Sequence, residues 1–585
     1  MSPSNLAREI QRLAFLATIA LLIWCGSHNR WSLESWQLPI QYGTDSATGD
    51  TKGMLATIKS ASEGNFAPYL SKYQPNLGAP QGAFWDDMPI TEQFLFWLPG
   101  LLVGFTGLFA AANLAVLIAQ ILAALSFYAV ARVIGAQWTW AAAGALLFAF
   151  SRMASARMIH HLPVTFYWHV PLCLLVCYWI ADGSLKLYSR KMIVALAIGV
   201  ISGIQNPYYT AMFIQLAGLA ALVPLWKRDY RVFLAAGAVA ASAIVCFFSM
   251  NLPTFWFKVT HGPNPGAIVR NYQWLEFFAL KPIDLVMPPP DHPFGMLRSL
   301  SQAYQSGVVI AGEVPPSGYL GIVGILALLW LLSVSIRNAI SSPPRSLPME
   351  AGQILYIAAF SIVGGLNGLA GVFGVHFFRS TNRYSIFILT IVLLFAAKNI
   401  PTSLRRSRIS AYALPLLIAI VGLVDILPPA PTGDDLAKMA YLIRGDRNFV
   451  TTLEAALPPK AMVFQLPFSY FPEASAPGLP AYEHFRPYLF SNSLKFSYGH
   501  VKGRGLEDWQ RTIFEQPLPD ALAEIQRKGF QAITIYRPAF QDNAVSLIAE
   551  LEKAVKFHRI NHADGTLTAL VPDPQPSRVA EPSKP

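Results

Sequence analysis

The fold is decided by an apolar run and the polar turn that follows it. The run is Leu13–Ser27 (LAFLATIALLIWCGS), preceded by Arg8 and Arg12, and the turn is Gln41–Asp50 (QYGTDSATGD). The apolar residues from about 11 to 28 match the ~17–25 residues that a helix needs to cross a membrane. The turn carries two aspartates, Asp45 and Asp50. We therefore expect both carboxylates just beyond a first membrane crossing, on the side opposite the basic start of the chain.

Composition supports a membrane protein. Of 585 residues, 54% are apolar and only 13% are charged, which is typical of a chain with many membrane spans. The formal charge of +11 does not indicate nucleic acid, because the basic residues lie in short loops between apolar runs. All four cysteines lie in apolar segments, and no CxxC metal pattern is present.

The sequence predicts a polytopic α-helical protein with about eleven transmembrane helices. A further apolar stretch, 94–105, contains Pro99 and Gly100 and is expected to lie along the membrane surface. The predicted spans are about 11–28, 110–133, 136–151, 163–181, 191–206, 208–225, 232–252, 318–336, 352–371, 382–398 and 409–427.

Lysine and arginine predict the orientation. They are concentrated in the loops on the side of the N-terminus, and the positive-inside rule makes that side cytoplasmic. We therefore expect a multi-pass protein of the inner membrane with a cytoplasmic N-terminus. The loops 29–109 and 253–317 and the tail from 428 are then extracytoplasmic, with the tail in the periplasm.

The chain divides into three predicted parts. Residues 1–427 form the transmembrane domain, residues 428–573 an α/β domain, and the Pro- and Ser-rich residues 574–585 a disordered tail. The α/β domain rests on the expected helices 434–457, 519–528 and 544–555 and the expected strands 461–466, 530–536 and 566–571.

Every polar cluster of interest falls on the outward side, where no nucleotide is supplied, and the inward loops contain no Gly-rich phosphate loop. Anabolic chemistry there needs a lipid carrier, such as a polyprenyl-phosphate sugar, and a carboxylate to deprotonate the acceptor hydroxyl. Asp50 and Asp45 are the candidate bases, with Asp50 slightly preferred. The alternative is that Asp50 only caps the helix that follows it.

Several outward residues are candidate substrate contacts. Arg157 and His161 are four residues apart, as are Arg379 and Arg383, and arginine forks match phosphate oxygens. The alternatives are interfacial arginines that set helix depth, hydrogen-bonded histidines, aromatic-belt tyrosines and plain loop residues. The candidates are Arg157, His160, His161, Tyr208, Tyr209, His292, Glu313, Arg379 and Arg383.

The chain places an acidic residue in its first outward loop, just after the first helix. In this arrangement it resembles the GT-C superfamily of integral-membrane glycosyltransferases, in particular bacterial members that use polyprenyl-phosphate sugars. The resemblance also covers Asn76–Gly82, Asp86-Asp87-Met-Pro, Arg157-x-x-His160-His161, Pro207-Tyr208-Tyr209 and Arg379-x-x-Asn382-Arg383. In the tail it covers Gln465-Leu-Pro-Phe, Phe471-Pro-Glu473 and the stretch 497–504. It implies a lipid-linked sugar donor, a saccharide or lipid acceptor of the cell envelope, and substrate contact by Asp87. No DxD motif supports a divalent metal.

Two other functions compete with glycosyl transfer. A flippase or transporter of lipid-linked sugars is the main alternative, although the predicted spans contain almost no ionisable residues, which ion-coupled carriers usually need. A transferase of phosphoglycerol or phosphoethanolamine would need a nucleophilic Ser or Thr beside metal ligands, and the tail shows no such cluster.

Overall fold

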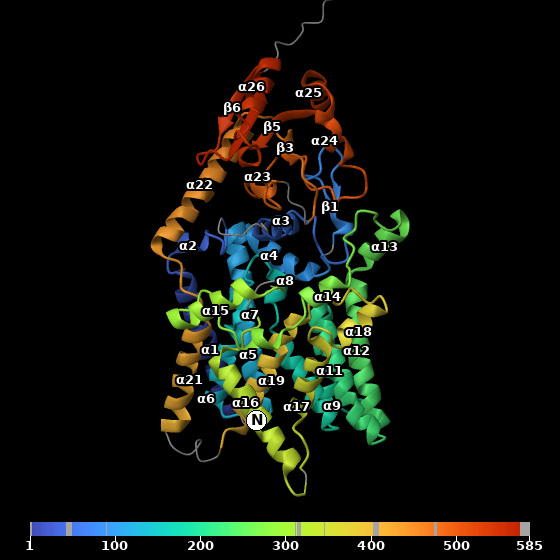
Figure 1. The fold of residues 1–585 in the computed structure, drawn as a ribbon, viewed down its shortest axis with the longest axis vertical. Helices are drawn as coiled ribbons and strands as arrows, with labels where there is room; N and C mark the ends of the chain where they lie inside the picture. Colours follow the sequence, from blue (N-terminus) through green and yellow to red (C-terminus); the bar gives the residue numbers. More distant parts are fainter. Residues whose placement is uncertain are drawn as a thin grey trace, which may run out of the picture.

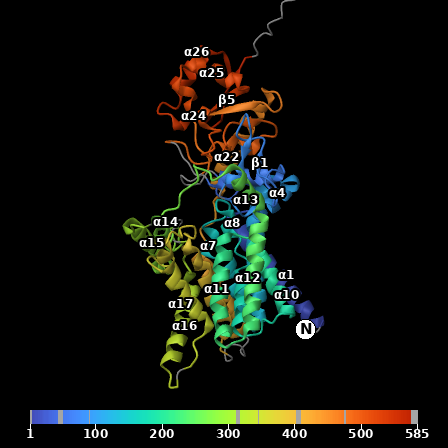
Figure 2. The ribbon, with the colours of Figure 1, turned by 90° about the vertical axis from the view of Figure 1, so that its right-hand side faces the viewer.

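The protein is elongated, with a helical bundle at one end and the tail domain at the other. The computed structural model describes residues 3–42, 50–88, 90–310, 312, 317–343, 345–401, 409–472 and 477–573. Figures 1 and 2 show the orange and red tail above the bundle, the N-terminus at the opposite end, and the first polar loop between bundle and tail. The structure confirms the predicted fold class.

Within the described residues, six helices are long and apolar enough to cross a membrane. These are α1 (Pro3–His28), α5 (Leu108–Val133), α11 (Pro207–Trp226), α12 (Tyr230–Met250), α16 (Gly321–Ile340) and the stretch Thr381–Asn399, which contains α19 (Ser385–Asn399). The count of eleven spans stays a prediction. The shorter helices of the bundle are α6 (Trp138–Ala149), α9 (Val170–Ala181), α10 (Arg190–Gly203), α17 (Met349–Ser361), α18 (Leu366–Val372) and α21 (Leu414–Ile426).

Two predicted spans are interrupted. In 163–181 the short α8 (Leu162–Thr165) precedes α9, and each helix has a proline in its first turn, a position where proline starts rather than continues a helix. In 352–371 the chain breaks between α17 and α18, where Gly364 has φ +72°. The helix itself ends at Ser361, because Ile362 is extended and pairs with Leu280, and the left-handed Gly364 then turns the chain into α18.

The first polar loop holds α2 (Leu33–Trp36), α3 (Asp50–Ser62), the paired strands β1 (Tyr73–Gln74) and β2 (Ala83–Phe84), and α4 (Gln93–Thr106). The later polar segments hold α7 (Arg152–Ser155), α13 (Leu252–His261), α14 (Gln273–Phe277) and α15 (Gly295–Gly307). Short 3₁₀ turns occur at Trp85–Asp87, Pro282–Leu285 and Thr381–Tyr384 (η3).

The tail is an α/β domain built on a five-stranded sheet in the order β4-β3-β5-β7-β6. The strands β3, β4 and β5 are parallel, whereas β7 runs antiparallel to both β5 and β6. Their bounds are β3 (Met462–Leu466), β4 (Lys495–Phe496), β5 (Phe530–Tyr536), β6 (Phe557–Asn561) and β7 (Leu567–Pro572). The helices are α22 (Gly433–Ala455), α23 (Phe485–Phe490), α24 (Asp508–Thr512), α25 (Leu518–Arg527) and α26 (Val545–Ala554).

The first polar loop continues the tail sheet beyond its edge strand. Leu77 pairs with Phe496 in a parallel bridge, and the Ala79 amide donates to the Phe496 carbonyl at 2.9 Å. The Phe496 amide in turn donates to the Asn76 carbonyl at 2.9 Å. Main-chain bonds therefore join the loop to the tail.

Buried polar side chains strengthen this joint. Lys52 of α3 lies 3.0 Å from the Glu483 carboxylate, and the Tyr42 hydroxyl donates to Asp446 at 2.8 Å. Arg486 bonds to Asp446 and Glu483 and reaches the Asp564 carboxylate at 2.8 Å. Buried charges are tolerated when paired in this way, so the network fixes how α3 sits beneath the tail.

Candidate active site

Asp50 is the first residue of α3, and its side chain is 23% exposed. Its carboxylate Oδ2 lies 3.4 Å from Nε2 of His161. The carboxylate faces a residue from a different polar segment.

His161 connects Asp50 to a buried arginine. Its Nδ1 lies 3.4 Å from Nη1 of Arg157, whose side chain is fully buried. A guanidinium only donates, so Nδ1 of His161 accepts, and Nε2 carries the proton that points at Asp50. The His161 amide donates to the Arg157 carbonyl at 3.0 Å, an α-turn that gives the contact predicted from the four-residue spacing.

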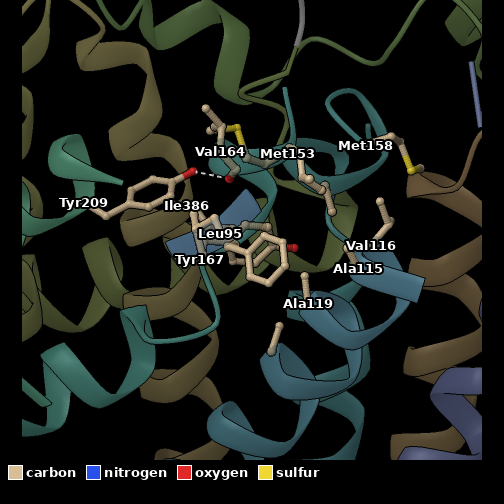
Figure 3. Close-up of a cluster of buried hydrophobic side chains, with 14 of the residues drawn as sticks. Leu95, Ala115, Val116, Ala119, Met153, Met158, Val164, Tyr167, Tyr209 and Ile386 are labelled. Carbon is tan, nitrogen blue, oxygen red and sulfur yellow. Dashed lines mark hydrogen bonds between the residues drawn. The ribbon is translucent and has the colours of Figure 1, made fainter. Parts of the chain in front are cut away.

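The segment that carries Arg157 and His161 is anchored in the core. Figure 3 shows the Tyr209 hydroxyl donating to the Val164 carbonyl, at 2.7 Å, within a cluster of buried side chains that includes Met153 and Tyr167. The Thr165 hydroxyl also donates to the Met158 carbonyl at 3.0 Å. A site held by packed residues keeps its geometry better than one on a loose loop.

Two other polar loops meet at the same place. Gln41 of the first loop accepts from Nδ1 of His160 at 2.8 Å, and Ser317 of the loop before α16 accepts from Nη2 of Arg157 at 3.2 Å. Sequence reasoning missed both Gln41 and Ser317, because an isolated amide or hydroxyl in a loop carries no spacing signal. Together they show that the loops predicted to face outward converge here.

Arg379 and Arg383 do not share one face. The Arg379 guanidinium lies 4.5 Å from the centre of the Phe278 ring, whereas that of Arg383 lies 4.5 Å from the Tyr208 ring. Both distances fit cation–π contacts. The intervening 3₁₀ turn η3 has three residues per turn, so a spacing of four no longer places two side chains together.

Arg383 belongs to a polar cluster that the sequence did not indicate. The Glu92 carboxylate is buried. It accepts a hydrogen bond from the side-chain amide of Asn206 at 2.7 Å and one from the main-chain amide of Thr91 at 2.9 Å. Burial raises the pKa of Glu92, and the Thr91 hydrogen bonds and the Arg383 charge oppose that rise. Tyr208 lies beside this cluster through its contact with Arg383.

The remaining candidates lie elsewhere. Asp87 binds Arg504 through both carboxylate oxygens, His292 is fully buried 3.2 Å from Asp425, and Tyr209 is a core residue. Asp45 and Glu313 lie outside the described residues, as does the predicted disordered tail 574–585. Of the predicted contacts, the structure thus joins Asp50, His161 and Arg157. His160 lies beside them, with its ring centre 4.5 Å from that of His161 and its Nδ1 bonded to Gln41.

The structure is similar to those of three kinds of protein. ArnT from Cupriavidus metallidurans in the apo state matches with a TM-score of 0.45 and 11% identity over 97% of this chain and 100% of ArnT. The same protein bound to undecaprenyl phosphate matches with a TM-score of 0.42 and 14% identity, over 96% of this chain and 99% of ArnT.

The other two kinds are an arabinofuranosyltransferase and an oligosaccharyltransferase. Mycobacterial arabinofuranosyltransferase AftD matches with a TM-score of 0.44 and 12% identity over 96% of this chain, which spans only 41% of AftD. The oligosaccharyltransferase of Archaeoglobus fulgidus matches with a TM-score of 0.41 and 11% identity over 89% of this chain and 69% of the archaeal protein. No protein-family model and no curated protein matches the sequence. At TM-scores below 0.5 these likenesses do not assign a function.

The side chains at the site can accept a proton and bind an anion. Asp50 supplies a partly exposed carboxylate, and the buried Arg157 supplies a permanent positive charge one histidine away. No group of three or more His, Cys, Asp or Glu among the described residues is arranged to hold a metal ion.

Proposed function

We propose that this protein is a membrane glycosyltransferase of the GT-C type, with Asp50 as its general base. The proposed donor is a polyprenyl-phosphate sugar, and the proposed acceptor is a saccharide or lipid of the cell envelope. The observation that carries the proposal is the contact of Asp50 with His161 and of His161 with the buried Arg157. A base next to an anion-binding cation is what transfer from a phosphate-linked sugar needs.

The proposed step begins at the acceptor hydroxyl. Its oxygen attacks the anomeric carbon of the sugar while its proton passes to the Asp50 carboxylate. The bond between the anomeric carbon and the phosphate oxygen breaks, and the lipid phosphate leaves with the bonding electrons. His161 holds the carboxylate in position through its Nε2 proton, and Arg157 stabilises the charge that develops on the departing phosphate.

The proposed site lies on the periplasmic side of an inner membrane, with the N-terminus in the cytoplasm. This orientation rests on the distribution of lysine and arginine among the short loops. Arg383 and Tyr208, which contact each other at 4.5 Å, are also proposed to contact the donor, because a guanidinium matches the oxygens of its phosphate.

The test is sugar transfer by detergent-purified protein supplied with a polyprenyl-phosphate sugar and an envelope acceptor fraction. Asp50→Asn should abolish transfer while leaving the protein folded. The matched control is Asp434→Asn, since Asp434 also lies in the first turn of a helix, α22, but is exposed on the tail. Asp45→Asn, tested in parallel, decides which of the two aspartates is the base.

Detergent removes the sealed bilayer that a flippase needs, so product formed under these conditions excludes flipping as the sole activity. Full transfer by an Asp45→Asn, Asp50→Asn double variant would refute the base assignment. Absence of any transfer by the wild-type protein, together with lipid movement in sealed vesicles, would favour the flippase alternative.

A further inference from the structure

A polar cavity lies at the end of the bundle opposite the tail. It has a volume of about 520 Å³ and lies between α9, α16, α17 and α19, whose lower ends are seen in Figure 1. Its polar lining residues are Tyr178, Arg337, Asn338, Glu350, Lys398 and Asn399. None of them takes part in the site around Asp50, so the cavity needs a separate explanation.

An apolar groove adjoins this cavity. The groove has a volume of about 310 Å³, runs between α6, α16, α19 and α21, and shares Trp330 with the polar cavity. Small residues deepen it, among them Gly144 and Ala396, and all its lining side chains are apolar. Leu326, at its rim, is 58% exposed on a helix that packs little against the bundle, so the groove faces the lipid phase.

The described lining of the cavity contains more positive than negative side chains. Arg337 and Lys398 are basic, and Glu350 is the acidic residue among these described lining residues. Both cations lie in the last turn of their helices, where the helix dipole favours positive charge. The Lys398 amine donates to the Tyr178 hydroxyl at 2.8 Å and lies 4.5 Å from the ring centre, which holds it at the cavity wall.

We propose that the cavity and groove form a binding site for an anionic phospholipid. The phosphate lies against Arg337 and Lys398, and one acyl chain lies in the groove past Trp330. The two basic side chains suit a phosphate group, and the adjoining apolar groove suits the acyl chain attached to it in a phospholipid. A soluble phosphate would leave the apolar groove unused. This site is independent of the proposed transferase activity.

The experiment measures lipid binding to the full-length, detergent-purified protein. Native mass spectrometry and thermal unfolding are followed with phosphatidylglycerol, phosphatidylcholine or inorganic phosphate. Phosphatidylglycerol should remain bound and raise the unfolding temperature, whereas the other two should not. Arg337→Gln with Lys398→Gln should weaken its binding about tenfold or more, because each basic group near a membrane surface adds to the attraction for anionic lipid.

The matched control is Lys227→Gln with Arg231→Gln, which removes the same charge from exposed residues at the ends of α11 and α12. It should leave phosphatidylglycerol binding unchanged. Arg337→Gln alone provides a variant at an exposed position in case the loss of Lys398 impairs folding. Ala396→Leu, which fills the groove, should also weaken binding.

Three outcomes would overturn the proposal. Equal phosphatidylglycerol binding by the wild type and the Arg337→Gln, Lys398→Gln variant would show that the lipid binds elsewhere. Equal stabilisation by phosphatidylcholine would show that the charges play no part. Equal stabilisation by inorganic phosphate would show an anion site without a lipid chain.

Discussion

Asp50 and Asp87 lie in the same polar loop and were both predicted to contact substrate, yet their surroundings differ. The Asp87 side chain is 2% exposed and binds Arg504 through two hydrogen bonds, at 2.5 and 3.0 Å. The Asp50 side chain is 23% exposed and lies 3.4 Å from a single histidine. The Asp87 carboxylate pairs the first loop with the tail, a contact that we call the Asp87–Arg504 clamp. The Asp50 carboxylate is partly accessible.

This difference shows that the neighbours of a carboxylate decide its use. The Arg504 guanidinium occupies both carboxylate oxygens of Asp87, so neither oxygen is open to a ligand. Among the described residues, Asp50 has one ionisable partner, His161, which leaves one of its carboxylate oxygens for a ligand. The comparison predicts that substitutions at the two positions damage different properties of the protein.

The largest expected effect is on catalysis. Asp50→Asn should lower sugar transfer by about 10²–10⁴-fold, the usual contribution of a general base, with little change in unfolding temperature. Asp87→Asn should keep transfer activity at temperatures where the variant stays folded. Transfer rates and thermal unfolding of both variants provide the measurement, and a reversed pattern would contradict the comparison.

The next effect is on stability. Asp87→Asn or Arg504→Gln should each lower the free energy of unfolding by about 2–3 kcal/mol, because each leaves a largely buried charge without its partner. The variant that carries both substitutions should lose less free energy of unfolding than the sum of the two single losses. Chemical denaturation of the four proteins in one detergent measures this coupling. Strict additivity would show that the clamp contributes nothing.

A smaller effect is expected beside Asp50. His161→Phe should lower kcat about tenfold, since it removes the donor that positions the carboxylate, whereas His161→Gln should retain part of the rate through its amide. Steady-state kinetics separate this from a binding defect, for which KM would change and kcat would not. A wild-type kcat in His161→Phe would remove the histidine from the site.

The smallest expected effect is a dependence of folding stability on pH, caused by a histidine where the first polar loop meets the tail. His500 packs against Gly78 of the first loop, and burial lowers the pKa of its imidazole to about 4. The unfolded chain takes up this proton below about pH 6.5 and the folded protein does not, so stability falls as the pH drops from 6.5 towards 4. Between pH 7 and 5 we expect a loss of about 1–2 kcal/mol, because the imidazole is buried in the folded protein and stays neutral there.

Thermal unfolding at several pH values measures this effect, and His500→Asn is the reference. The variant should show a flatter dependence of unfolding temperature on pH than the wild type. An equal slope in both proteins would assign the acid sensitivity to other groups.

Local patterns in the sequence predicted much of the fold. Strand β5 has the predicted bounds, 530–536, because a run of apolar and β-branched residues follows a glycine that ends a helix. Strand β4 was missed because two residues carry no periodicity, and β6 because its edge position leaves polar residues such as His558 and Arg559 exposed.

The candidate site was predictable only where its contacts are local. The spacing of Arg157 and His161 predicted their contact, which an α-turn provides. The meeting of Asp50 with His161 depends on the packing of α3 beneath the tail, and no local pattern encodes it. The same limit explains Glu92, whose partners Asn206 and Arg383 come from distant segments.

The pairing of the first polar loop with the tail sheet has a consequence for how the chain folds. Asn76 and Ala79 are synthesised long before Phe496, and until that strand emerges their main-chain groups lack these native partners. Contacts so distant in sequence form slowly, because a very long loop must close first. A chain truncated after the last membrane helix should therefore insert into the membrane, but its first polar loop should lack its partners in the tail and be cleaved readily by proteases.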